Sequence, residues 1–182
     1  MQDDDWFSLA ELTQRLGALV WVEGQVAELL VGWSRIEAAG SVALAFRATG
    51  GHHQWHAEIL TDCLPTSPLL EPKDAVRPPT TGWQKAVETL SSLTDPEATA
   101  ARLRSMVKVV DPWLEREIGS LTELARPVSD ASMSRWLRFV SLDHADDGEA
   151  LFHLLAARSS EPTRFEDHAL VSALDLNEVV CD

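Results

Sequence analysis

The sequence contains no tyrosine and few basic residues, and each shortage excludes a class of function. Without tyrosine, neither a tyrosyl radical nor a tyrosinate metal ligand is available. Lys and Arg number 15 against 29 Asp and Glu, so the formal net charge is −14. Binding to phosphate groups needs clustered Lys and Arg. The composition therefore argues against nucleic acid or an anionic membrane surface as the main partner.

Cysteine is also scarce, and long hydrophobic runs are not evident. Cys63 and Cys181 lie far apart in the chain and match no metal-binding spacing, which is typical of reduced thiols in the cytoplasm. Three of the first five residues are Asp, unlike the basic start of a secretory signal. No apolar run approaches the roughly 20 residues that span a bilayer. We therefore expect a cytoplasmic protein without a membrane span.

The remaining composition is that of a globular protein. Apolar residues make up 45% of the 182 residues, enough to bury a sizeable core in one domain. The hydrophobic periodicity described below predicts one helical domain over residues 1–158. Residues 159–182 begin polar and end with a modest apolar pattern, and we expect them to form a C-terminal tail.

The first predicted helix covers residues 7–38 and has an unusual seam. Its inward positions follow an alternating spacing of three and four residues, which is typical of a helix packed in a bundle. These positions are Leu9, Leu12, Leu16, Leu19, Glu23, Val26, Leu30 and Trp33. Glu23 therefore occupies a core position where an apolar residue is expected.

The second predicted helix covers residues 41–62 and places two histidines in the core in succession. Its seam is Val42, Phe46, Thr49, His53, His56 and Leu60. His52 lies off this seam and is expected at the surface or behind the inward residues. Gly50 and Gly51 precede the histidines and mark either a kink or a close helix contact.

A proline-rich segment, residues 63–95, separates the second helix from the third. It includes a short amphipathic piece from Trp83 to about Leu93 and is long enough to travel the height of a bundle, so the second and third helices can run in the same direction. Asp95-Pro96 predicts the start of the third helix, which runs to about Ala125. This helix carries Pro112 at its centre, after Asp111. A proline there usually kinks a helix, at a cost of about 3 kcal/mol.

The fourth predicted helix runs from Ser129 or Asp130 to about Ala157, and two inward stripes fit it. One contains Asp143 and the other contains His144, whereas both contain Asp147. We therefore expect Asp147 to point inward whichever of the two stripes is buried.

The polar core positions lie at a common height. Measured from the turn near residue 39, Glu23 lies level with His53 and His56 at a rise of about 1.5 Å per residue. Measured from the turn near residue 128, Asp111 lies level with residues 143–147. We therefore expect all four helices to present polar groups to one region at mid-height.

This layout resembles the ferritin-like superfamily, in which four helices with a long crossover after the second hold a di-iron or di-manganese carboxylate site. The resemblance implies an all-α, ferritin-like four-helix bundle with its crossover at 63–95. It also implies iron or manganese as cofactor. The residues it assigns as metal ligands are Glu23, His53, His56, Asp111, Asp143, His144 and Asp147.

Two departures from that family pattern are visible. His53 stands where the family has a bridging glutamate, and on the fourth helix His144-x-x-Asp147 or Asp143-x-x-Asp146 stands in for the second Glu-x-x-His. Such a donor set suits one metal as easily as two. Two functions remain open: a metal-dependent oxidoreductase that uses O₂ or peroxide on a small molecule, or a metal-free binding module with a buried polar network. For the second, a homodimer through an exposed bundle face is the expected assembly.

Overall fold

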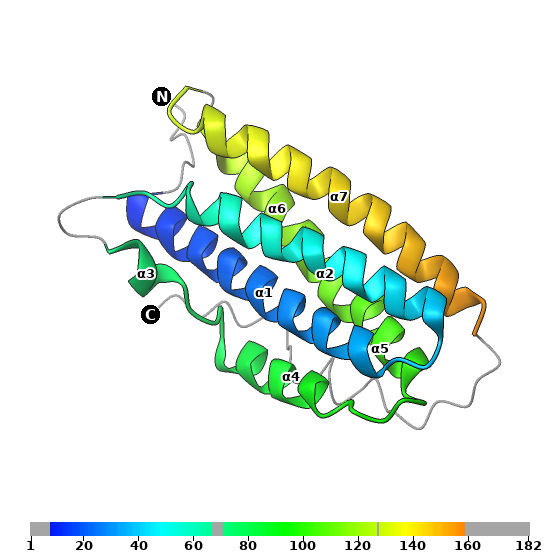
Figure 1. Ribbon diagram of the computed structural model, residues 1–182. Helices are drawn as coiled ribbons and strands as arrows, with labels where there is room; N and C mark the ends of the chain where they lie inside the picture. The colour runs from blue at the N-terminus through cyan, green and yellow to red at the C-terminus, as the bar shows by residue number, and fades with distance from the viewer. Residues whose placement is uncertain (1–7, 67–70, 127, 159–182) are drawn as a thin grey trace.

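The computed structural model describes residues 8–66, 71–126 and 128–158, and every regular element within these ranges is a helix. Helices α1 (Leu9–Ile36) and α2 (Gly40–Thr61) form an antiparallel hairpin. A third long helical stretch consists of α5 (Thr99–Ser105), the π-helix η1 (Met106–Val110) and α6 (Asp111–Leu124). Helix α7 (Ala131–Ala156) follows. The all-α prediction is confirmed (Figure 1).

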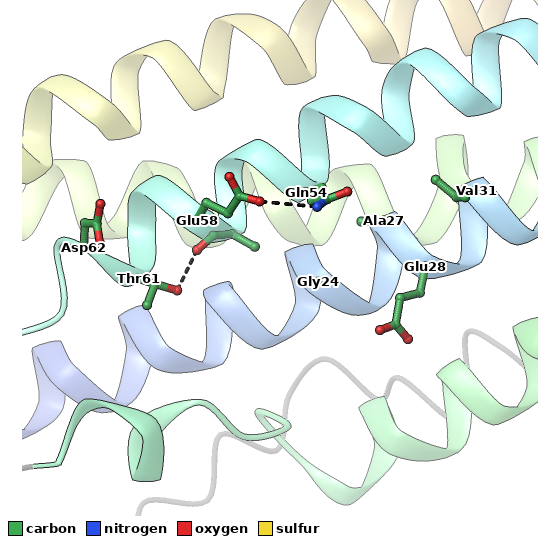
Figure 2. Close-up of a pocket in the computed structure, with 9 residues that line it drawn as sticks. Gly24, Ala27, Glu28, Val31, Gln54, Glu58, Thr61 and Asp62 are labelled. Carbon is green, nitrogen blue, oxygen red and sulfur yellow. Dashed lines mark hydrogen bonds between the residues drawn. The ribbon is translucent and has the colours of Figure 1, made fainter.

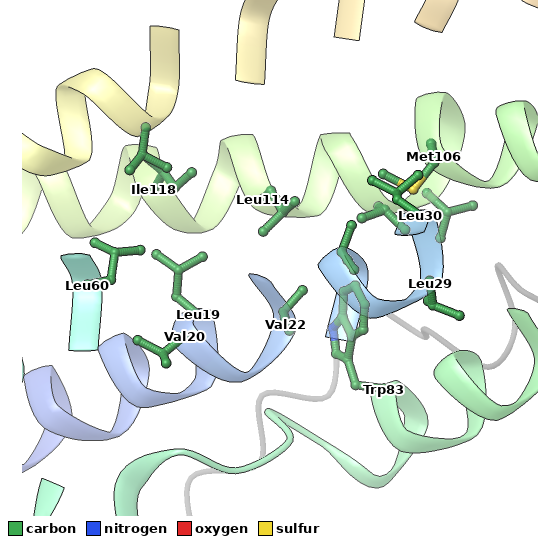
Figure 3. Close-up of a cluster of buried hydrophobic side chains, with 14 of the residues drawn as sticks. Leu19, Val20, Val22, Leu29, Leu30, Leu60, Trp83, Met106, Leu114 and Ile118 are labelled. Carbon is green, nitrogen blue, oxygen red and sulfur yellow. The ribbon is translucent and has the colours of Figure 1, made fainter. Parts of the chain in front are cut away.

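The long helices enclose one apolar core. Helix α1 packs on α2 and α6, and α7 packs on α2, on α6 and on η1. Aliphatic side chains of these helices fill the centre (Figure 3), among them Leu19, Val22, Leu30, Leu60, Leu114 and Ile118. At Gly50 the backbones of α2 and α1 approach closely, because an added Cβ would lie 3.3 Å from the backbone nitrogen of Val31. Of the pair Gly50 and Gly51, Gly50 therefore makes the close helix contact that was one of the two interpretations.

The segment between α2 and α5 crosses back along α1. It contains α3 (Pro72–Ala75) and α4 (Thr81–Ser91), and both pack on α1 (Figure 1). Gly17 is needed for this contact, since an added Cβ would lie 2.2 Å from the carbonyl oxygen of Ala75. The crossover returns the chain to the other end of α1. Helix α2 and the α5–α6 stretch therefore run in the same direction, as expected.

The helix ends agree closely with the predicted ranges, with one exception. Helix α1 begins with a capping box in which Ser8 and Glu11 satisfy each other's backbone N–H groups. The third helix, however, begins at Thr99, not at Asp95-Pro96. Asp95 accepts a hydrogen bond from the backbone of Glu97 in a preceding turn, 2.9 Å away. The predicted tail, 159–182, lies outside the described residues.

The π-helix explains how Pro112 is accommodated. The backbone N–H of Asp111 donates to the carbonyl of Met106, five residues earlier, so the helix is wider by one residue just before the proline. A proline in a regular helix loses one hydrogen bond and its ring clashes with a carbonyl of the preceding turn. The wide turn relieves that conflict, and the chain continues directly into α6 with Asp111 buried.

Helix α1 corrects one expectation. By length and composition Leu9–Ile36 would be able to cross a membrane, with a mean hydropathy of 1.2 over its most apolar 18 residues, although no such segment was expected from the sequence. In the structure 67% of that window is buried among the other helices. This burial is what a core helix shows, and the cytoplasmic location stays a prediction.

Candidate metal centre

Four buried side chains from three helices meet inside the protein. They are Glu23 on α1, His53 and His56 on α2, and His144 on α7. One donor atom from each lies within 4.8 Å of the donor atoms of the others. The spacing of three residues between His53 and His56 places both on the inner face of α2. Imidazole nitrogens and a carboxylate oxygen at these separations could hold a metal ion.

Glu23 is the centre of this group. Its Oε2 lies 2.5 Å from Nδ1 of His53, and its Oε1 lies 2.8 Å from Nε2 of His144. An ionised carboxylate only accepts hydrogen bonds, so both imidazoles donate to it. Burial alone would raise the pKa of Glu23, but His144 and His53 together hold it well below its usual value. The carboxylate is therefore ionised and shared between two imidazole rings.

The two histidines that donate to Glu23 differ in their electrostatics. Burial, together with the neighbouring His144 and His56, lowers the pKa of His53 more than Glu23 raises it, so the net shift is downward. For His144, burial also lowers the pKa, but Glu23, Asp111 and Asp147 outweigh it and the net shift is upward. The positive charge that balances Glu23 in the metal-free protein is therefore favoured on His144.

His56 has an unsatisfied nitrogen. Its Nε2 lies 3.1 Å from Oδ2 of Asp143, and donation to this carboxylate leaves the lone pair on Nδ1. Nδ1 lies 3.6 Å from Oε2 of Glu23 and has no hydrogen-bond partner among the described residues. A buried polar atom without a partner costs about 1–3 kcal/mol. The arrangement of Asp143 behind His56 is the one that orients metal-binding histidines.

Asp111 is brought to the edge of the group by α6 but does not join it. Its side chain is buried, and Oδ2 has no hydrogen-bond partner within the described ranges. Burial, opposed by His144 and reinforced by Glu115, Asp147 and Glu23, raises the pKa of Asp111 to about 7. Its Oδ2 is 3.7 Å from the position that a Cβ on Gly148 would occupy. No sequence pattern marked Gly148 as part of this region.

Asp147 lies farther out than expected. Its Oδ2 is 2.9 Å from Nδ1 of His52, whose side chain is half exposed. Asp147 and His52 therefore form a pair at the rim, and His144 is the α7 residue that reaches the centre. The stripe through Leu137, Val140, His144 and Leu151 is the buried one. Of the seven predicted ligands, four converge, Asp143 contacts one of them, and Asp111 and Asp147 flank them.

Two other polar features are separate from this centre. At the end of α1, the buried guanidinium of Arg102 pairs with Glu37 at 2.9 Å and also donates to backbone carbonyls, so its charge is fully compensated. A shallow groove between α1 and α2 is lined by small and acidic residues, including Gly24, Glu28, Glu58 and Asp62 (Figure 2). None of the four convergent residues lines that groove.

Comparison of the chain with protein-family models, with curated proteins and with solved structures finds no match. The chemistry of the centre therefore has to be argued from its geometry. That geometry offers three imidazoles and one carboxylate, all buried, and one imidazole nitrogen has a lone pair without a donor in the part of the chain that the structure describes.

Proposed function

We propose that Glu23, His53, His56 and His144 bind one first-row divalent metal ion, and that the metal-loaded protein is an oxidoreductase acting on a small molecule. The observation that carries the proposal is the lone pair of His56 Nδ1, which is buried, faces Glu23 and has no donor among the described residues. A metal ion is the partner that would satisfy this nitrogen together with its three neighbours.

A ferritin-like four-helix bundle is the architecture that we propose for this centre. Three features support it: an antiparallel α1–α2 hairpin, a long crossover that makes α2 and α6 run the same way, and polar residues on α1, α2 and α7 that meet inside the core. In such bundles the metal is held between facing helices. The all-α fold is observed, and the ferritin-like arrangement of its helices is the part that we propose.

The donor set favours one metal over two. Dinuclear carboxylate centres need several bridging carboxylates, whereas Glu23 is the sole carboxylate among the four convergent residues. Three imidazoles and one carboxylate suit iron or manganese, and also zinc. Iron or manganese with four protein ligands would supply one-electron chemistry with O₂ or peroxide at its remaining positions. The protein's own residues would set the charge, exclude bulk water and orient His56 through Asp143.

A metal-free network is the alternative, and the two short hydrogen bonds at Glu23 favour it. With His53 at 2.5 Å and His144 at 2.8 Å, the carboxylate is already well paired without a metal. The protein would then be a binding or interaction module in which this network fixes how α1, α2 and α7 pack. The alternative leaves His56 Nδ1 without a hydrogen-bond partner among residues 8–66, 71–126 and 128–158, and for that reason we rank it second.

Metal content decides between the two functions. Protein purified without chelator, then loaded anaerobically with Fe²⁺ or Mn²⁺ and desalted, is expected to retain about one ion per chain by elemental analysis. His53→Ala should lose the ion. His52→Ala, one residue away but half exposed, should keep it and serves as the matched control. Metal content near zero after loading would leave the metal-free network as the function.

The redox part of the proposal needs its own measurement. Iron-loaded protein mixed with O₂ or peroxide should show a change in its visible or electron paramagnetic resonance spectrum that His53→Ala lacks. If the protein retains one zinc ion, and the iron-loaded protein shows no spectral change with O₂ or peroxide, the metal site stands but the oxidoreductase assignment is wrong.

A further inference from the structure

Helix α7 carries apolar side chains on its outer face as well as on its inner face. The inner face includes Leu137 and His144, and the helix packs on α2 and α6 along one edge of the bundle (Figure 1). On the outer face Leu142 is 63% exposed, and Phe139 and Phe152 are each 49% exposed. The outer face of a surface helix usually carries charged and polar residues instead. Several large apolar side chains along one exposed helix face are typical of an interaction surface.

This apolar surface continues from α7 onto α2. The ring of Phe139 lies 5.9 Å from the ring of Trp136, and that ring lies 6.1 Å from the ring of Trp55 on α2, measured between centroids. Trp55 is itself exposed. The three aromatic rings hold one another in place without becoming buried, and aromatic residues are enriched in the contacts between proteins.

The charged residues on the outer face of α7 are separated by sign. Arg135 and Arg138 precede Leu142, whereas Asp146 and Glu149 follow it, and all of them are exposed. Their spacing of three and four residues places them on one face. At a rise of about 1.5 Å per residue, Arg138 and Asp146 each lie about 6 Å from Leu142 along the axis, and Arg135 and Glu149 each lie about 10.5 Å from it. The face is therefore positive at one end and negative at the other, with a leucine at its centre.

These charges are not neutralised within the helix. Only residues three or four positions apart are neighbours on a helix surface. No acidic residue lies at such a distance from Arg135 or Arg138, and no Lys or Arg does from Asp146 or Glu149. Within the described ranges, neither arginine takes part in an ion pair, and Asp146 does not either. Glu149 lies 3.5 Å from Nε2 of the exposed His153. The face therefore offers charges of both signs to a partner.

We propose that a second copy of this chain covers this face, so that two α7 helices pack antiparallel about a two-fold axis near Leu142. In that arrangement Arg138 lies level with Asp146 of the partner subunit, and Arg135 lies level with Glu149 of the partner subunit. The symmetry repeats both pairs on the other side of the axis. A parallel arrangement would instead bring arginine to arginine, and like charges in an interface are unfavourable. The order of the charges therefore favours the antiparallel dimer.

This dimer is independent of the proposed metal site, because none of the four convergent residues lies on the outer face of α7. Exposed ion pairs contribute about 0.2–1 kcal/mol each, so the charges determine the orientation more than the affinity. The affinity comes from Leu142, Phe139 and the neighbouring rings. A contact centred on one helix from each copy is small, and we expect a dimer that forms at micromolar concentrations.

Sedimentation of the full chain tests the dimer. We expect twice the mass of one chain at micromolar concentrations, and weaker association in high salt because exposed ion pairs are screened. Leu142→Glu should weaken the dimer by roughly tenfold or more, since it brings two carboxylates together at the two-fold axis. Leu44→Glu is the matched control. Leu44 is 69% exposed on α2, away from the outer face of α7, and its substitution should leave the dimer intact.

An exchange of charges tests the antiparallel pairing itself. The double variant Arg135→Glu with Arg138→Glu makes the face acidic throughout, and the double variant Asp146→Arg with Glu149→Arg makes it basic throughout. Each double variant alone should be monomeric under conditions in which the unaltered chain is a dimer. A mixture of the two in equal amounts should form a dimer that contains one chain of each. All four positions are exposed, and circular dichroism checks that the fold is retained.

Three results would overturn the proposal. The first is a full chain that sediments as a monomer throughout the micromolar range. The second is a dimer that Leu142→Glu leaves as strong as before, because the copies would then meet through another surface. The third is a pair of double variants that do not associate when mixed. Metal content enters none of these measurements, so a failure of the metal site would leave this proposal standing.

Discussion

Nδ1 of His56 lies 3.6 Å from Oε2 of Glu23, too far for a hydrogen bond and close to the separation of two ligands on one metal ion. Two adjacent ligands, each about 2.1 Å from a metal ion, are about 3.0–3.4 Å apart. The contraction needed to bind a metal is therefore a few tenths of an ångström, which makes this pair the most direct place to test the centre.

Removal of the His56 side chain should abolish metal binding without unfolding the protein. We expect His56→Ala to retain less than a tenth of the metal that the unaltered chain holds. The metal should also protect the unaltered protein, by about 2.7 kcal/mol at a free concentration a hundredfold above Kd. Chemical denaturation with and without Mn²⁺ measures this stabilisation. An equal gain in His56→Ala would mean that the ion binds elsewhere.

Glu23→Gln should destabilise the metal-free protein at neutral pH. A glutamine amide offers one acceptor and a donor group where two donating imidazoles require acceptors, and the charge of His144 is then left without its carboxylate. Loss of one partner of a buried ion pair costs about 3–5 kcal/mol. The measurement is urea denaturation at pH 7, with Glu28→Gln on the exposed face of α1 as the control. If Glu23→Gln is more stable than the unaltered protein, the hydrogen-bond network around Glu23 destabilises the metal-free fold.

Asp111 should make the stability of the metal-free protein fall as pH rises. Its pKa rises on folding from 3.8 to about 7, so the folded protein binds a proton that the unfolded chain releases between these values. The contribution of Asp111 to the free energy of unfolding is fully present below about pH 4. Between about pH 4 and pH 7 it decreases by about 1.4 kcal/mol for each pH unit. The difference between the unaltered protein and Asp111→Asn, measured from pH 4 to 8, isolates this effect. A flat difference would show that Asp111 is ionised throughout.

How far the sequence could predict this centre depends on the helix concerned. On α1 and α2 the hydrophobic spacing was unbroken, so the burial of Glu23, His53 and His56 followed from their positions in the seam. On α7 two stripes fitted equally well, because aromatic and acidic residues interrupt the apolar pattern. The choice between Asp143 and His144 was made by packing against α2 and α6, which periodicity along one helix does not encode.

The third helical stretch shows a different limit. Periodicity assumes a constant 3.6 residues per turn, and the π-helix at Met106–Val110 adds one residue to a turn. Pro112 indicated that the regular helix was disturbed, but not how. Asp111 was expected at mid-height among the ligands. The structure places it beside them, outside the group of four, and its Oδ2 packs near Gly148 of α7.

The contact between the crossover and α1 gives a test of the fold that is independent of any metal. Gly17→Ala would place a Cβ 2.2 Å from the carbonyl oxygen of Ala75, so the backbone of α3 or α1 must move. Such overpacking costs about 1–3 kcal/mol. Gly32→Ala, on the same helix with no described atom within 4 Å of the added Cβ, should instead stabilise the protein by up to about 1 kcal/mol because alanine is the better helix former. In thermal denaturation we therefore expect the melting temperature to fall for Gly17→Ala and to rise for Gly32→Ala. Equal shifts in the two variants would mean that the crossover does not contact α1 at Gly17.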